Sequence, residues 1–94
     1  MEIRIELKFN KSISRLAGNS FGQEIYDLQV KDIINFSEKN IIIFPDYIQD
    51  LAISFVQGFT MKIFQVISKD EFFDHFTIQS NEKIINKFTK GIFY

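Results

Sequence analysis

With 94 residues, the chain has the length of one small domain, and its 46% hydrophobic and 24% charged residues exclude a disordered chain. Eleven basic residues against twelve acidic ones give a net charge of −1, which argues against nonspecific nucleic-acid binding because that binding needs a basic surface. The chain has no cysteine, which excludes both a disulfide framework and a thiolate metal site.

The first segment, residues 2–9, alternates charged and apolar side chains, and Ile3, Ile5, Leu7 and Phe9 share one face. A strict period of two predicts a strand with one face in water, and its charged residues would protect a sheet edge. The same alternation is unlike a signal peptide or a membrane span. We therefore expect a cytoplasmic protein with no membrane partner.

Residues 10–19 are rich in small polar residues and predict a loop, in which a fourth strand has room. A first helix is expected from Ser20, because Ser20 and Gln23 have the spacing of a capping box, in which each side chain bonds the backbone of the other residue. Two apolar stripes on this helix indicate packing against the sheet and against another element.

Residues 41–44 are four apolar residues in succession, and such a run is typical of a central strand covered on both faces. Pro45 ends the strand because it has no amide hydrogen for a ladder. After a turn, a second helix of about four turns is expected from Ser54 to residues 66 or 67. Gly58 inside this helix suggests close packing at that point.

A short strand is expected over residues 76–78. A last helix follows, with Ser80 or Asn81 as its cap and Gly91 as its stop. The alternation of strands and helices predicts one α/β domain over residues 1–94. Its sheet should be mixed or mostly parallel, with three to four strands flanked by about three helices.

Few residues suggest catalysis or a cofactor. His75 is the only histidine, and a metal site would need a second clustered ligand, so a structural or surface histidine is the favoured interpretation. The glycines at 18 and 22 lack the lysine of a phosphate loop, so an ordinary loop is the favoured interpretation, with an anion held at the helix N-terminus as the alternative. Arg15 is interpreted as exposed, with anion binding as the alternative. We therefore expect no metal, no cofactor and no enzyme; an enzyme would need His75 and two loop carboxylates in one pocket.

Ser54 is the strongest candidate for a functional residue. It follows a buried strand and a turn and opens a helix, near the sheet edge where ligands of α/β proteins bind. Its ordinary role would be an N-cap. Its functional role would be a phosphate acceptor on a partner-binding surface that includes Asp50, Phe55 and Gln57, because a phosphate adds about two negative charges there.

Three stretches of the chain together resemble the STAS-like domain family of unknown function, whose fold is that of sulphate-transporter and anti-sigma-factor-antagonist domains. They are AGNSFGQEIYDLQVKDIIN, IIIF and ISFVQGFTMKIF, and the resemblance covers roughly residues 17 to 88. The residues that stand at matching places are Gly22, the run 41–44, Ser54, Phe55 and Phe59. The chain departs from the family where Gln57 and Tyr26 replace charged residues.

The resemblance implies a regulator that docks onto a protein and does not catalyse a reaction. Anti-sigma-factor antagonists bind a serine kinase with the histidine-kinase-like ATPase fold and are switched by phosphorylation of a serine, and Ser54 stands at a comparable place.

One alternative is a phage or mobile-element inhibitor that blocks a host defence protein. A homodimer is a further alternative, with contacts through the first strand or through residues 92–94.

Overall fold

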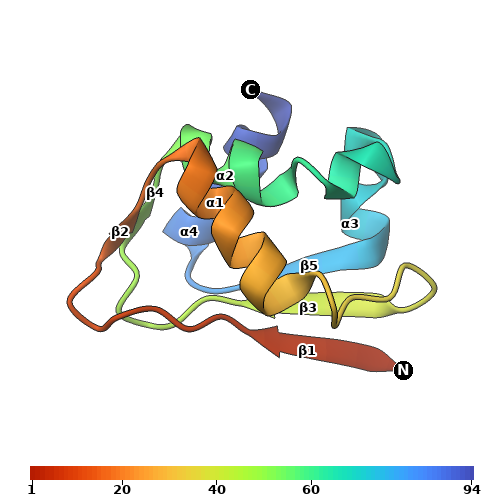
Figure 1. The fold of residues 1–94 in the computed structure, drawn as a ribbon, viewed down its shortest axis with the longest axis horizontal. Coiled ribbons are helices and arrows are strands. Elements are labelled where there is room, and N and C mark those ends of the chain that lie inside the picture. The colour runs from red at the N-terminus through yellow and green to blue at the C-terminus, as the bar shows by residue number, and fades with distance from the viewer.

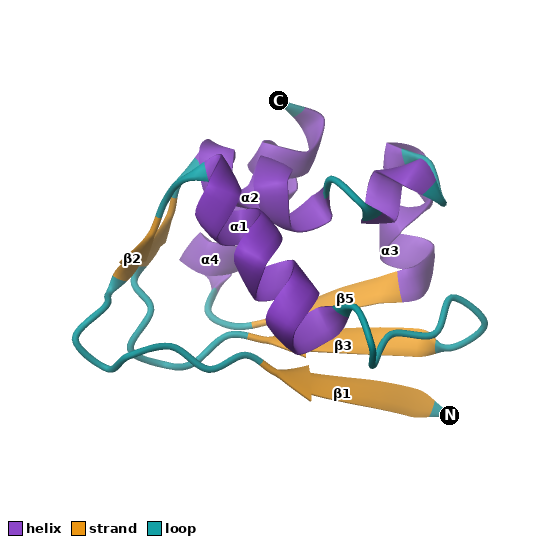
Figure 2. Cartoon of the chain, viewed as in Figure 1, coloured by secondary structure: helices purple, strands orange, loops and turns teal.

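Five strands form two sheets in the computed structural model, which describes residues 1–94 (Figures 1 and 2). The larger sheet has the order β1-β3-β5, the smaller one pairs β2 with β4, and all three pairings are parallel. The predicted α/β class with a mostly parallel sheet is therefore confirmed. The strands are β1 Glu2–Glu6, β2 Arg15–Leu16, β3 Lys39–Ile43, β4 Asp50–Leu51 and β5 Phe76–Gln79.

Four α-helices accompany the strands, one more than predicted. They are α1 Asn19–Ile25, α2 Ile53–Thr60, α3 Phe72–His75 and α4 Glu82–Phe93. A π-helical segment, Tyr26–Val30, continues α1, and two 3-10 segments, Ile63–Gln65 and Lys69–Glu71, lie between α2 and α3. The extra helix α3 follows a capping box formed by Ser68 and Glu71.

The three-stranded sheet is covered by helices on one face only (Figure 1). On that face Ile5, Ile42 and Ile78 stand side by side and are 2%, 0% and 5% exposed. On the other face the register partners of Ile41 are Arg4 and Thr77, and both are exposed. The predicted burial of β3 on both faces is confirmed at Ile41 and Ile42, but helices cover only one of these faces. Ile41 is nevertheless buried, because it occupies the central strand.

Strand β1 is an edge strand with exposed charged residues, as its alternation predicts. It ends at Glu6, three residues earlier than expected. Beyond this point the side-chain amide of Gln29 accepts a hydrogen bond from the Lys8 N–H at 2.7 Å and donates one to the Lys8 carbonyl at 2.8 Å. The Gln29 side chain therefore takes the place of a neighbouring strand as the hydrogen-bond partner of the Lys8 backbone.

Helix α2 is packed between α1 and α4, and glycines make both contacts close. A Cβ atom on Gly58 would lie 2.0 Å from the Asn19 carbonyl oxygen of α1, and one on Gly91 would lie 2.5 Å from the Val56 Cβ. The expected close packing at Gly58 is confirmed. The expectation that Gly91 stops the last helix is wrong, because α4 continues to Phe93.

The α-helix that was expected to reach residues 66 or 67 ends at Thr60. The Thr60 hydroxyl donates a hydrogen bond to the Val56 carbonyl at 2.7 Å in this last turn. Ile63 still points into the core from the following 3-10 segment. The apolar spacing therefore indicated the buried residues correctly but not the type of helix.

Candidate functional site

Two strand–helix units lie side by side at one end of the molecule (Figure 1). Strand β2 leads into α1 and β4 leads into α2, with Leu16 paired to Leu51 and the Ala52 N–H bonded to the Leu16 carbonyl at 2.8 Å. The sequence Ser-Phe-x-Gln occurs at the start of each helix. Ser20 and Ser54 are both the second residue of their helix, so the sequence repeat corresponds to a structural one.

Neither serine is an N-cap, so both capping predictions are wrong. The N-cap residues are Gly18 and Ala52, and neither provides a side-chain cap. The half-buried Ser54 hydroxyl instead accepts a hydrogen bond from the Gly18 N–H at 3.0 Å. Gly18 has a φ of 100°, a conformation that favours glycine. The Ser54 oxygen therefore joins the start of α2 to the turn before α1, while Ser20 is exposed.

The other two predicted residues of α2 differ in accessibility. Phe55 is 0% exposed, and its ring lies 5.7 Å from the Phe21 ring and 5.9 Å from the Phe59 ring. Phe55 is thus a core residue, and its proposed contact with a partner does not agree with this burial. Gln57 is exposed and lines a hollow of about 240 Å³ together with Met61.

Asp50, the fourth predicted residue, is the centre of an ion-pair cluster. The Arg15 Nε donates to Asp50 Oδ2 at 3.1 Å, and the Lys87 Nζ lies 3.1 Å from Asp50 Oδ1. The Asp50 side chain is 27% exposed and that of Arg15 is 58% exposed. The Lys87 ammonium is the largest cause that lowers the pKa of Asp50; burial opposes it, and the Arg15 hydrogen bond lowers the pKa further.

This lowered pKa predicts acid sensitivity that depends on Asp50. The pKa of Asp50 in the folded chain lies below its unfolded value of about 3.8, so the Asp50 charge stabilises the fold fully at pH values above 3.8. This stabilisation is lost as the pH falls through the folded-state pKa. Asp50→Asn should therefore unfold at a lower urea concentration than the native chain at pH 7, and the difference should shrink at pH 3. Urea titrations at both pH values test this. A difference that is equal at both pH values would contradict the predicted role of the Asp50 charge.

A cavity of about 310 Å³ lies at the start of α2, beside this cluster. Its lining residues come from β2, β4, α2 and α4, and are Arg15, Leu51, Ala52, Ile53, Lys87 and Lys90. The sequence suggested Arg15 for anion binding and Lys87 and Lys90 for the C-terminal end of the last helix, but did not bring the three together. The signal was present, because Lys83, Lys87 and Lys90 have the spacing of one exposed face of α4.

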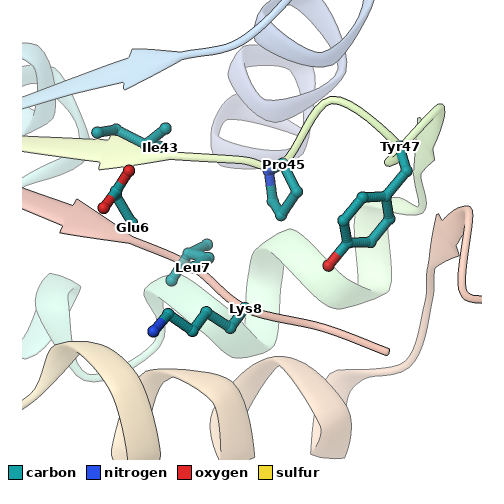
Figure 3. Close-up of a pocket in the computed structure, with 6 residues that line it drawn as sticks. All are labelled: Glu6, Leu7, Lys8, Ile43, Pro45 and Tyr47. Atoms are coloured by element: carbon teal, nitrogen blue, oxygen red, sulfur yellow. The ribbon is translucent and has the colours of Figure 1, made fainter. Parts of the chain in front are cut away.

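A second cavity, of about 270 Å³, lies where β1 and β3 end (Figure 3). Glu6 and Lys8 contribute opposite charges to its wall, and the Tyr47 ring faces it from the turn after β3. The Tyr47 hydroxyl donates to the Phe9 carbonyl and accepts from the Phe9 N–H at 3.3 Å, so its hydrogen bonds are used within the fold. None of the predicted site residues lines this cavity.

His75, at the end of α3, lies within the packing of the loop before β3. Its Nδ1 is 2.9 Å from the Phe36 carbonyl oxygen, and the two rings are 6.0 Å apart. These contacts agree with a structural histidine.

Comparisons with known proteins leave the site to be interpreted from its geometry alone. No family model matches the chain, and neither the curated proteins nor the solved structures include a match. None of the helices is long and apolar enough to span a bilayer.

Proposed function

We propose that the chain is a regulatory protein-binding module, STAS-like in function, that does not catalyse a reaction. Its partner-binding surface is the α2 rim, defined as Asp50, Ser54 and Gln57. The partner class that fits the resemblance is a serine kinase or ATPase of the histidine-kinase-like fold. These side chains come from two neighbouring elements and reach solvent at one end of the molecule.

The observation that carries this proposal is the hydrogen bond between the Gly18 N–H and the Ser54 hydroxyl. A phosphate on this oxygen would add about two negative charges at a junction between two helices. Because the same oxygen holds the Gly18 turn, the modification would change both the charge and the local backbone. One modified atom would then alter the whole α2 rim, which suits a switch that controls docking.

We expect Ser54→Asp to reduce partner capture by about tenfold or more, which corresponds to a loss of about 1.4 kcal/mol of binding free energy. The matched control is Ser20→Asp, since Ser20 is the equivalent residue of α1 and is exposed. Each tagged chain is used as bait in its host lysate, and captured proteins are quantified by mass spectrometry. Equal capture by the two variants would contradict the proposal.

Ser54→Ala separates loss of the hydroxyl from gain of charge. It leaves the Gly18 amide without its side-chain acceptor and should cost about 1 kcal/mol of unfolding free energy. Urea titration of the variants shows whether reduced capture reflects unfolding. If Ser54→Ala binds as well as the native chain while Ser54→Asp does not, the added charge is responsible.

A further inference from the structure

The cavity at the start of α2 has more positive charge in its wall than the adjacent carboxylate neutralises. Arg15, Lys87 and Lys90 line it, and Asp50 is the one carboxylate that pairs with any of them. Lys90 forms no ion pair, and Lys83 lies near enough to lower the pKa of Asp50 by its charge. This concentration of cations occurs in a chain whose net charge is −1. The cavity therefore has a local positive potential that favours an anion.

Several hydrogen-bond donors beside this cavity have no acceptor within the protein. Arg15 uses only its Nε on Asp50, so both terminal amino groups of the guanidinium are free. Lys90 donates no hydrogen bond, and the N–H groups of Ile53 and Ser54 bond to no protein atom. A guanidinium fork and an ammonium group together match the geometry and charge of a phosphate group.

Asp50 positions these donors but does not neutralise all of their positive charge. Its two oxygens hold Arg15 and Lys87, which come from β2 and α4, in one place at 3.1 Å each. The remaining excess of cations favours a ligand with two negative charges over one with a single charge. A volume of about 310 Å³ is at the lower end of the range for small-molecule pockets, which suits a compact ligand.

We propose that this cavity binds a small phosphate monoester, with its phosphate held by Arg15, Lys87 and Lys90. The proposal goes beyond the protein-binding function and does not rest on it, because it uses the cavity and its cations and not the Ser54 hydroxyl. A ligand here would lie directly beside the α2 rim, so its binding would also add negative charge to the surface that the partner contacts.

The experiment is a titration of ¹⁵N-labelled chain with inorganic phosphate and with glycerol 3-phosphate, at pH 7.5 and constant ionic strength. We expect saturable shifts of the Ile53 and Ser54 amides, with dissociation constants of about 1 mM for each probe. The double variant Arg15→Gln/Lys90→Gln should bind at least about tenfold more weakly. The matched control is Lys11→Gln/Lys31→Gln, which removes the same charge from exposed positions.

Unchanged amide shifts at up to about 100 mM phosphate would overturn the proposal, as would equal weakening in the two double variants. Saturable binding of inorganic phosphate without binding of glycerol 3-phosphate would restrict the ligand to the free ion and overturn the monoester assignment. The dispersion of the amide spectrum shows in every sample that the chain is folded. Partner capture by Ser54→Asp is measured separately, so failure of one proposal leaves the other testable.

Discussion

Gly58→Ala should lower the free energy of unfolding by about 3 kcal/mol, because the added methyl overpacks the contact between α1 and α2. The new Cβ would lie 2.0 Å from the Asn19 carbonyl oxygen and 2.8 Å from its carbonyl carbon. Both are backbone atoms, so relief requires a shift of a whole helix. The gain of about 1 kcal/mol from the higher helix propensity of alanine is too small to offset this clash.

The neighbouring substitution Gln57→Ala is the matched control for Gly58→Ala. Gln57 is exposed in the same helix and should change stability by less than about 0.5 kcal/mol. Gly22→Ala, whose Cβ would lie 2.2 Å from the Phe55 carbonyl oxygen, should behave like Gly58→Ala. Urea titrations of the three variants measure these effects. A Gly58→Ala chain that is as stable as the native chain would show that the two helices do not approach so closely.

Asn40→Asp should lower the free energy of unfolding at pH 7 by about 3–5 kcal/mol, since it buries a charge without a counter-ion. Asn40 is 0% exposed and faces three carbonyl oxygens. Its Nδ2 donates to the carbonyls of Asn35 at 2.9 Å, Glu38 at 3.1 Å and His75 at 3.2 Å, and its Oδ1 accepts from the Asn35 N–H at 3.0 Å. A carboxylate could still accept the hydrogen bond from the Asn35 N–H, but its negative charge would be repelled by the three carbonyl oxygens.

The Asn40→Asp defect should also depend on pH. Burial against carbonyl oxygens raises the pKa of a carboxyl above its unfolded value, so the part of the penalty that comes from the charge is absent below that value and grows as pH rises through it. The stability difference from the native chain should therefore shrink between pH 7 and pH 4. Asn86→Asp, at an exposed position of α4, is the control and should have little effect. A difference that does not change with pH would contradict this account.

The strands of the larger sheet could be predicted because their residues are numerous enough to show a pattern. The alternation in residues 2–9 and the apolar run at 41–44 indicated β1 and β3, and the burial of their side chains agrees with an edge strand and a central strand. The sequence pattern could not predict that helices cover only one face of the sheet. A buried residue such as Ile41 on the open face gives the same signal as one beneath a helix.

The α2 rim was only partly predictable, because its geometry depends on contacts between distant residues. Strands β2 and β4 have two residues each, which is too few for any periodic signal. The roles of the two serines depend on whether the helix begins one or two residues earlier, and propensity does not resolve boundaries at that level. The proximity of Arg15 to Lys87 arises only when β2 pairs with β4 beside α4.

Hydrogen–deuterium exchange of the chain, alone and bound to its captured partner, tests most directly whether the α2 rim is the docking surface. The proposal predicts slower exchange on binding in peptides that cover residues 13–20 and 49–57. Residues 31–38, in the loop before β3 at the other end of the sheet (Figure 1), should exchange equally in both states. Protection of residues 31–38 with no change at 49–57 would contradict the account and would place the partner elsewhere.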